Sequence, residues 1–223
     1  ISPVKPFAIR GAIWYQGEGN LGDGMAYFDK MKALIQGWRS VWQVGDFPFY
    51  LAQLASFRYD APANLLPKFW EAQTASLSIP NTGMAVITDI SNLADIHPAN
   101  KQDVGKRLAL WALAKTYGKD MEYFGPLYKS MAIEGGKIRI AFDHAGSGLA
   151  SRDGQPLTWF EIAGEDKKFV KADAVIDGNT VVVSSQSVAA PVAVRFAWSQ
   201  EAEPNLMNKE GLPANSFRTV LWD

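Results

Sequence analysis

Hydrophobic and polar positions in the first half of the chain follow two patterns in turn: continuous apolar runs, and apolar residues spaced three and four positions apart. Continuous apolar runs of strand length occur at residues 7–15, 49–54 and 83–89. After the first run, large apolar residues recur at spacings of three and four, at Phe28, Met31, Leu34, Ile35, Trp38 and Trp42. This stripe predicts an amphipathic helix, and helices are also predicted over 66–77 and 101–117. Strands that alternate with helices predict a parallel sheet covered on both faces.

The pattern changes past about Tyr123, where short apolar runs are separated by turn residues. Such runs predict strands at residues 130–133, 137–142, 159–162, 174–176, 180–184 and 192–197. Asp177-Gly178 lies between two of these runs, and Asp-Gly in that position is a hairpin signal. We therefore predict an α/β protein in which residues 1–122 form the sheet-and-helix domain and residues 123–223 a small antiparallel, sandwich-like β-domain.

Composition excludes several classes of function. The chain has 223 residues, of which 48% are hydrophobic, enough for one sizeable core or two modest ones. Its net charge is -1 with acids and bases mixed, so nucleic acid is not expected as a partner. No apolar run reaches the roughly 18 residues of a membrane span, so no membrane is expected either. The absence of cysteine excludes disulfides and thiolate metal sites, but leaves the compartment open.

A glycine-rich loop follows the first predicted strand. The run Gly17-Glu18-Gly19-Asn20-Leu21-Gly22 matches the G-x-G-x-x-G pattern of dinucleotide sites between a strand and a helix. However, Glu18 and Asp23 place negative charge where a pyrophosphate would lie. The next strand also ends without an acid for a ribose hydroxyl. Two other interpretations remain: an ordinary loop whose glycines supply positive φ, or a site loop at the carboxyl end of a strand.

The chain has two histidines. His144 lies in a polar loop of the second half, and we interpret it as a solvated loop residue. His97 lies between a predicted buried strand and a long helix, flanked by Asp95 and Pro98. A nearby carboxylate orients an imidazole and stabilises its charged form, as catalysis requires. A histidine that only caps the following helix is the alternative, and these residues alone do not separate the two.

Five segments together resemble a known family. They are Trp14-Tyr15-Gln16-Gly17-Glu18, residues 95–101 (DIHPANK), residues 104–110 (VGKRLAL), residues 125–131 (GPLYKSM) and residues 208–214 (NKEGLPA). In this order and at these spacings they closely resemble the sialate O-acetylesterase family of SGNH/GDSL-type hydrolases. The similarity runs over nearly the whole chain. It implies that residues 1–122 are the C-terminal part of an SGNH-hydrolase domain with a partial SGNH-type sheet.

The resemblance implies a serine carbohydrate esterase that removes O-acetyl groups from sugars, of the sialic acid or xylan type, without metal or cofactor. Such enzymes usually act in the periplasm or after secretion. His97 would be the general base and Asp95 the carboxylate that orients it. SGNH enzymes often place this acid three residues before the histidine, where this chain has Ala94. Asp89, at the end of the strand, is therefore a second candidate for the acid.

The same resemblance assigns the glycine-rich loop to the oxyanion. Gln16 and Gly17 would bind it through a side-chain amide and backbone N–H groups, in a loop that also contains Asn20. The family often has Gly-x-Asn at this place, whereas here the asparagine comes one residue later. Glu18 would brace the loop and would not react.

The nucleophilic serine of the family has no counterpart among the motifs of this chain. In the family it lies near the start of the domain, in a Gly-Gln-Ser-Asn-Met-like segment. Here Ser40 and Ser76 fall on predicted helices, and Ser2 and Ser56 lack a glycine-flanked elbow. We therefore expect the serine in an upstream segment outside this chain, and the N-terminal part of the same gene product as a tight partner. Purified alone, the chain is expected to be inactive.

Two other functions remain as alternatives. The first is a non-catalytic carbohydrate-binding or scaffold protein that has kept an esterase-like surface. The second is a nucleotide-binding α/β protein, which the glycine-rich loop alone would allow. A thermal shift with NAD tests the second, because a ligand at 100 times its Kd stabilises the folded state by about 2.7 kcal/mol.

Overall fold

The computed structural model describes residues 2–5 and 7–222. Its first half contains a parallel sheet in the order β1-β2-β3, with strands Ala12–Trp14, Phe49–Ala52 and Thr82–Ala85. The α-helices are α1 (Ala26–Trp42), α2 (Leu65–Ala75) and α3 (Lys101–Trp111). Shorter helices are η1 (Ser2–Val4), η2 (Glu18–Asp23), η3 (Ser76–Ser78), η4 (Thr88–Ile90) and the π-helix η5 (Ala112–Thr116).

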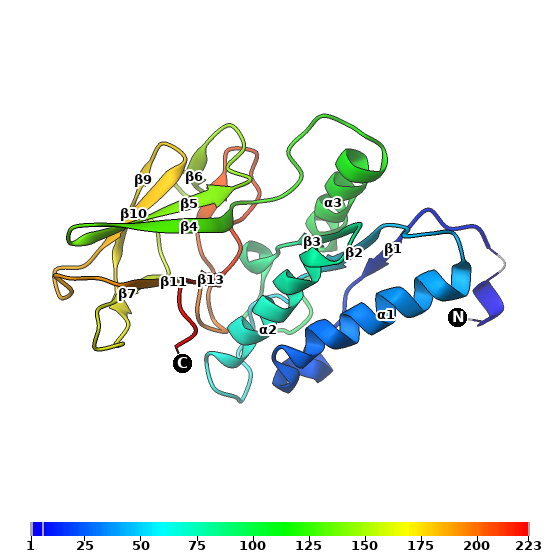
Figure 1. Ribbon diagram of the computed structural model, residues 1–223, viewed down its shortest axis with the longest axis horizontal. Helices are drawn as coiled ribbons and strands as arrows, with labels where there is room; N and C mark the ends of the chain where they lie inside the picture. The colour runs from blue at the N-terminus through cyan, green and yellow to red at the C-terminus, as the bar shows by residue number, and fades with distance from the viewer. Residues whose placement is uncertain (1, 6, 223) are drawn as a thin grey trace.

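The sheet lies between two helical layers, with α1 and α2 on one face and α3 on the other (Figure 1). Trp111 of α3 packs directly over Gly83 of β3, where a Cβ atom would overlap its ring. The missing side chain therefore lets α3 approach the sheet closely, and Trp111 Nε1 donates to the carbonyl oxygen of Met84 at 2.8 Å. This contact fixes the start of the loop that carries His97.

The second half consists of antiparallel sheets. Two four-stranded sheets have the orders β4-β5-β10-β9 and β13-β11-β7-β8, and β12 pairs with β6. The strands are β4 (Leu127–Glu134), β5 (Lys137–Asp143), β6 (Leu149–Ser151), β7 (Phe160–Ala163), β8 (Val170–Lys171), β9 (Asp173–Asp177), β10 (Thr180–Ser184), β11 (Ala193–Phe196), β12 (Leu206–Asn208) and β13 (Phe217–Arg218). Their inward side chains form one continuous core.

The predicted fold class is confirmed: a parallel sheet with helices precedes antiparallel sheets. The strand predicted over 7–15 is shorter, because only Ala12–Trp14 pairs with β2. The predicted helix over 101–117 changes to π-helix after Trp111. Four strands were not predicted, namely β6, β8, β12 and β13, and each has only two or three residues. Strands this short show no alternation from which a sequence pattern can be detected.

The two edge strands of the parallel sheet differ in exposure. All four residues of β3 are buried. In β1, by contrast, the side chain of Ile13 is 71% exposed. A groove of 170 Å³ runs beside β1, with Tyr50 and the exposed Tyr117 in its lining. One edge of this sheet is thus covered by the chain itself, and the other presents apolar surface.

Buried polar contacts join the two halves of the chain. Gln53 Nε2 donates to Asn215 Oδ1 at 2.7 Å, and Asn215 Nδ2 donates to Thr74 Oγ1 at 2.8 Å. Arg218 forms two hydrogen bonds with the carboxylate of Glu71, both 2.8 Å long. Among the described helices, none combines the length and apolar character needed to cross a membrane.

Candidate functional site

The loop after β1 is ordered by a chain of side-chain hydrogen bonds. Tyr27 Oη of α1 donates to the carbonyl oxygen of Gln16 at 3.0 Å and lies 3.3 Å from Gln16 Oε1. Gln16 Nε2 donates to Asn20 Oδ1 at 2.7 Å, and Asn20 Nδ2 donates to Asp23 Oδ2 at 2.7 Å. Lys30 completes the chain with an ion pair to Asp23 at 2.6 Å. The structure thus brings Gln16 and Asn20 into direct contact.

Gly17 allows this loop to lie against the core. A Cβ atom at this position would lie 2.7 Å from the ring of Phe69 in α2 and 3.2 Å from Leu54. No side chain larger than hydrogen fits there. The segment after Gly17 forms the 3-10 helix η2, and α1 begins only at Ala26. A dinucleotide site would need a tight turn directly into the N-terminus of an α-helix, which this loop does not form.

The hydrogen-bond donors of this loop are partly occupied within the loop itself. Glu18 Oε2 accepts the backbone N–H of Gly17 at 3.1 Å. Gln16 Nε2 has two N–H groups, and the contact with Asn20 uses one of them. The second N–H of the Gln16 amide is therefore one of the donors that this loop leaves for a ligand, while Glu18 covers the donor of Gly17.

His97 lies in the exposed loop between β3 and α3. Its side chain is 79% exposed and that of Asp95 is 59% exposed. The His97 Nδ1 atom is 3.7 Å from Asp95 Oδ1, which is longer than a hydrogen bond. Asp95 Oδ1 instead accepts the backbone N–H of His97 at 2.9 Å. Asp95 thus shapes the backbone of the loop.

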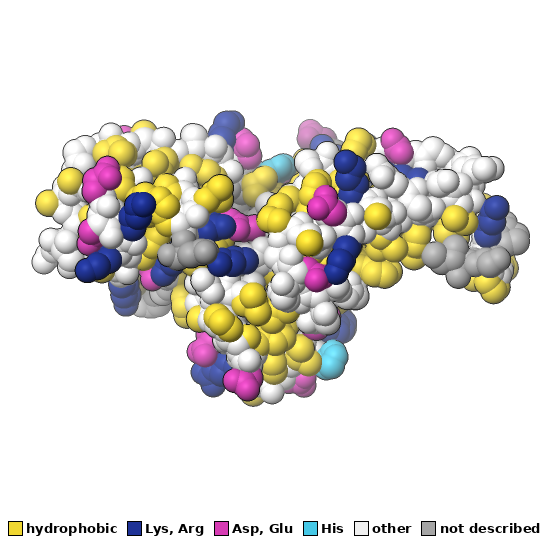
Figure 2. All heavy atoms as spheres, turned by 60° about the horizontal axis from the view of Figure 1, so that its bottom comes forward, with side chains coloured by type: hydrophobic (Ala, Val, Ile, Leu, Met, Phe, Trp, Pro, Cys, Tyr) yellow, Lys and Arg dark blue, Asp and Glu magenta, His cyan; other side chains and the backbone are white. Residues whose placement is uncertain are grey.

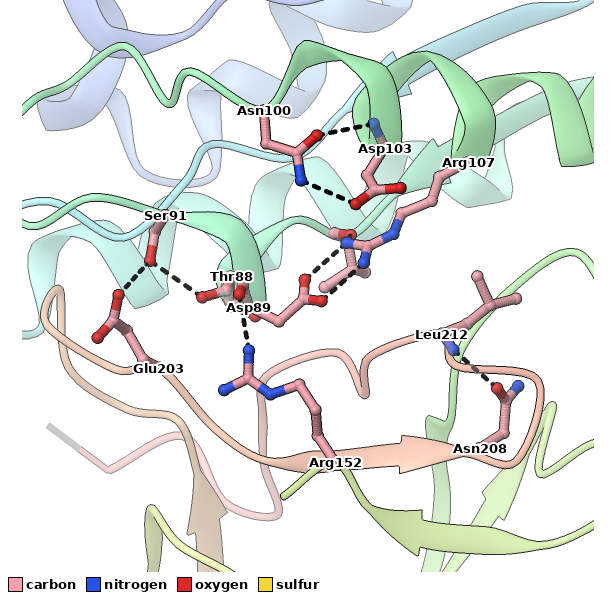
Figure 3. Close-up of polar contacts among 11 residues, drawn as sticks. Thr88, Asp89, Ser91, Asn100, Asp103, Arg107, Arg152, Glu203, Asn208 and Leu212 are labelled. Atoms are coloured by element: carbon pink, nitrogen blue, oxygen red, sulfur yellow. Dashed lines mark hydrogen bonds and ion pairs between the residues drawn. The ribbon is translucent and has the colours of Figure 1, made fainter.

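Asp89 has a different environment. Its carboxylate accepts two hydrogen bonds of 2.6 Å from the guanidinium group of Arg107, and the two side chains are only 9% and 10% exposed. Arg107 also donates to the carbonyl oxygen of Val86 at 2.8 Å. In Figure 3, Asp89 and Arg107 face each other below the first turn of α3. Asp89 therefore anchors the base of the loop and is not paired with His97.

Three loops meet at the carboxyl edge of the parallel sheet, where open α/β sheets place their sites. Lys101, the first residue of α3, has its Nζ atom 4.7 Å from the ring centre of Tyr15. This contact joins the His97 loop to the Gln16 loop. The loop after β2 joins them through Arg58, whose N–H donates to the carbonyl oxygen of Leu93 at 3.3 Å.

Two tyrosines at this edge carry perturbed hydroxyl groups. Burial, together with the negative charge of Glu18, raises the pKa of Tyr15 to about 12. Burial and the charges of Glu18 and Tyr15 likewise raise the pKa of Tyr59 to about 12. Both side chains therefore stay neutral hydrogen-bonding groups at physiological pH. Neither was assigned a role from the sequence, because an aromatic residue after a strand is indistinguishable by pattern from a core residue.

The interpretation of His144 as a solvated residue is wrong. Its side chain is only 24% exposed, and its Nδ1 atom lies 2.9 Å from Glu122 Oε1. Its ring packs edge-on against Tyr123 and Phe124. The two histidine side chains, coloured cyan in Figure 2, lie far apart on the surface shown. His144 is therefore a structural group of the contact between the two halves.

The serines that were considered as nucleophiles lie away from His97 or are already engaged. Ser40 is exposed on α1, and Ser76 is buried with its hydroxyl donating to the carbonyl oxygen of Ala72. Ser56 is 1% exposed and its hydroxyl donates to the carbonyl oxygen of Ala202. Ser2 lies in η1, which precedes β1. Within residues 2–5 and 7–222, no group of three His, Asp or Glu side chains is placed to hold a metal ion.

Arg107 lies within the quoted segment 104–110, but sequence reasoning assigned it no role. It lies on the buried face of α3 together with Val104, Leu108 and Trp111. The available signal was the position of Arg107, a charged residue three positions after Val104 in an apolar stripe. Charged side chains are rarely buried without a partner, so the pattern already required a buried acid nearby.

Comparisons with known proteins agree on one family. The family model described as "Carbohydrate esterase, sialic acid-specific acetylesterase" matches residues 2–114. The sialate O-acetylesterase of Homo sapiens is 29% identical, in a match covering 100% of this chain and 48% of that protein. The enzyme of Mus musculus is 28% identical over 89% of this chain and 41% of its own length.

A solved structure gives the same result. The crystal structure of a carbohydrate acetylesterase from Xanthomonas citri superposes with a TM-score of 0.94 at 43% identity. The match covers 100% of this chain and 53% of that chain. The chain thus spans about half the length of these relatives. Because the family model covers half of the sequence, the chain belongs to the carbohydrate esterase family of sialic acid-specific acetylesterases.

Proposed function

We propose that this chain is the histidine-bearing part of an esterase that removes O-acetyl groups from sugars. The observation that carries the proposal is the meeting of the Gln16 loop and the His97 loop at one edge of the sheet, in a member of a carbohydrate esterase family. The related enzymes are named for sialate and carbohydrate acetyl esters. We expect an acetylated carbohydrate of the sialic acid or xylan type as the substrate.

In the proposed reaction, His97 is the general base of a serine nucleophile. It takes the hydroxyl proton as the serine oxygen attacks the acetyl carbonyl carbon. The bond between that carbon and the sugar oxygen then breaks, and His97 returns the proton to the departing sugar hydroxyl. A water molecule, deprotonated in the same way, attacks the acetyl-serine and releases acetate and free serine. The high exposure of His97 is compatible with a proton carrier that awaits a partner segment.

The amide of Gln16 is the proposed oxyanion donor. Tyr27 and Asn20 fix its orientation, and one of its N–H groups remains for a ligand. Preorganised donors of this kind contribute about 3–4 kcal/mol to transition-state stabilisation. The N–H of Gly17 becomes a second donor once the Glu18 carboxylate moves from it. Glu18 thereby braces the loop in the absence of substrate.

Asp95 is the proposed orienting acid. It is adjacent to His97 and needs only a small rotation to reach Nδ1 from 3.7 Å. Asp89 is the less favoured candidate, because it would have to leave two 2.6 Å hydrogen bonds with Arg107. Breaking such a buried pair leaves an uncompensated charge, which costs several kcal/mol.

The serine, in this proposal, comes from an upstream segment of the same gene product. That segment would pair with β1, whose Ile13 is 71% exposed and lies beside an apolar groove. Exposed apolar edge strands are otherwise liable to aggregate. We place the complete protein in the periplasm or outside the cell, as the family resemblance implies.

Fluorophosphonate labelling of the natively purified protein, read by intact-mass spectrometry, tests the proposal. A label on a second, co-purifying polypeptide supports a serine supplied from outside these residues. A label on a serine within residues 1–223 contradicts the assignment of the nucleophile. The absence of label on the complete gene product favours the alternative of a non-catalytic carbohydrate-binding or scaffold protein.

Activity of the isolated chain gives a second test. Without the nucleophile, the chain should hydrolyse an acetylated sugar no faster than its His97→Ala variant, because only weak residual electrostatic catalysis remains. His97-dependent turnover by the isolated chain would contradict the proposal that the serine lies elsewhere.

A further inference from the structure

The segment 199–205, which joins β11 to β12 in the second half, contacts the loop after β2. Gln200 is 6% exposed, and its side-chain amide donates to the carbonyl oxygens of Tyr59 at 3.0 Å and Ala61 at 3.4 Å. Its backbone accepts the N–H of Phe57 at 3.0 Å and donates to Ala63 at 2.8 Å. Four hydrogen bonds from one buried residue thus fix the course of this loop.

The second half also contacts the loop that leads to His97. Arg152 Nη1 donates to the carbonyl oxygen of Asp89 at 2.7 Å, and Ser91 Oγ donates to Glu203 Oε1 at 2.7 Å. Figure 3 shows both contacts reaching from the second half to the segment that follows β3. They lie at the base of the exposed loop that carries His97, where a shift in the backbone would displace the imidazole.

Arg152 and Glu203 are themselves connected through Asn205, which is 2% exposed. The carbonyl oxygen of Asn205 accepts the N–H of Arg152 at 2.8 Å. Its side-chain amide donates to Asp153 Oδ1 at 2.9 Å and to the carbonyl oxygen of Pro156 at 3.0 Å. The hydrogen bond from Asn205 is the largest of the contacts that lower the pKa of Asp153 to about 2. The turn at 151–156 and the segment 199–205 are therefore joined by several hydrogen bonds.

We propose that the second half of the chain positions the loops of the esterase site, with Gln200, Arg152 and Glu203 as positioning residues. Gln200 sets the loop after β2, and the other two set the base of the His97 loop. The hydrogen bond from Arg58 to Leu93 then couples the two loops. This proposal rests on the proposed role of His97. In it, the β-domain supports catalysis by holding the backbone of the loops in place, and its role is not to bind glycan.

Hydrogen exchange read by mass spectrometry on the complete gene product tests this proposal. The double variant Arg152→Ala/Glu203→Ala is compared with Arg139→Ala/Glu134→Ala, which removes an ion pair of 2.7 Å in the same half that contacts neither loop. We expect exchange over residues 86–98 to become about ten-fold faster in the first variant only, because that segment loses its contacts from Arg152 and Glu203. In that segment, the amides of Asp95 and His97 are hydrogen-bonded and report on the loop.

Kinetics on the same variants separate positioning from stability. The first variant should lose about ten-fold or more in kcat with KM nearly unchanged, since small misplacements of a catalytic group are costly. Glu203→Gln, which keeps the accepting oxygen, should retain most of the activity that Glu203→Ala loses. Equal exchange over 86–98 in the two double variants overturns the proposal, and so does faster exchange with kcat equal to the control. If the complete gene product shows no His97-dependent activity, the proposed function is refuted instead. The exchange comparison can still be interpreted in that case, because it does not depend on activity.

Discussion

The loop after β1 and the loop after β3 carry the two parts of the candidate site, and they are stabilised in different ways. The Gln16 loop lies on the core of its own half: Gly17 packs against Phe69, and Tyr27 of α1 fixes Gln16. The His97 loop is held at its base by the Asp89–Arg107 pair and through Leu93 by Arg58, while the side chain of His97 is 79% exposed.

This difference indicates which part of the site the chain completes by itself. The Gln16 loop, the proposed oxyanion side, is ordered by contacts within the first half. The His97 loop receives contacts from the second half at Asp89 and Ser91 and, in our proposal, also depends on a segment outside the chain. In the structure, His97 Nδ1 and Asp95 Oδ1 are 3.7 Å apart, so no side-chain hydrogen bond joins them.

The largest expected effect comes from breaking the anchor of the His97 loop. Arg107→Ala leaves the carboxylate of Asp89 buried without its partner, and we expect the free energy of unfolding to fall by about 3–5 kcal/mol. Urea denaturation of the chain measures it. Adding Asp89→Asn should restore part of the loss, because the uncompensated charge is gone.

Lys106→Ala is the matched control for this experiment. Lys106 precedes Arg107 on α3 but is exposed, so its loss should change stability by less than about 0.5 kcal/mol. A loss below about 1 kcal/mol in Arg107→Ala would mean that this pair does not anchor the loop, since breaking a buried pair costs more.

The next effect concerns the Gln16 loop. In Gly17→Ala the new methyl group would lie 2.7 Å from the Phe69 ring, so the loop or α2 must shift. Overpacking of this kind costs about 1–3 kcal/mol. Gly19→Ala is the control, because no atom lies within 4 Å of its added Cβ. Equal thermal stabilities of the two variants would show that the loop does not rest on the core as described.

A smaller effect should appear at alkaline pH. Burial raises the pKa of Tyr27 to about 12, whereas an unfolded tyrosine titrates near 10. The folded state therefore favours the neutral form, and this stabilisation is complete below pH 10 and is lost as the pH rises towards 12. Tyr27→Phe should weaken the fall in unfolding free energy over that window. Tyr117→Phe, at an exposed tyrosine, should leave the fall as in the parent chain.

Sequence patterns predicted the parts of the fold that have strong periodicity. The stripe from Phe28 to Trp42 correctly predicted α1, but its most buried residues are Tyr27, Met31, Ile35 and Arg39. Compared with the predicted stripe, the buried face of the helix is rotated towards Arg39, because the guanidinium group of this residue donates to the carbonyl oxygens of Phe47 and Pro80. Such contacts between distant segments leave no periodic trace in the sequence.

The candidate site divides in the same way. The motifs identified Gln16, Gly17, Asp95 and His97 as a set, and their assigned roles stay predictions. The contacts that order the loops come from Tyr27, Arg107 and the segment 199–205, to which the motifs assigned no role. The motifs thus marked candidate residues, whereas the contacts that position them depend on the fold and leave no local pattern in the sequence.

The smallest effect on stability is expected at His97 itself. Its side chain is 79% exposed and its separation from Asp95 exceeds a hydrogen bond, so His97→Ala should change the free energy of unfolding by less than about 0.5 kcal/mol. The same substitution in the complete protein should remove esterase activity, because the serine loses its base. The two measurements together sharpen the comparison of the loops. A substitution in the exposed His97 loop would remove activity and leave stability almost unchanged, whereas a substitution at Gly17 would affect both. A loss of stability in His97→Ala as large as that in Gly17→Ala would mean that the His97 loop is packed as firmly as the Gln16 loop, and the contrast between them would fail.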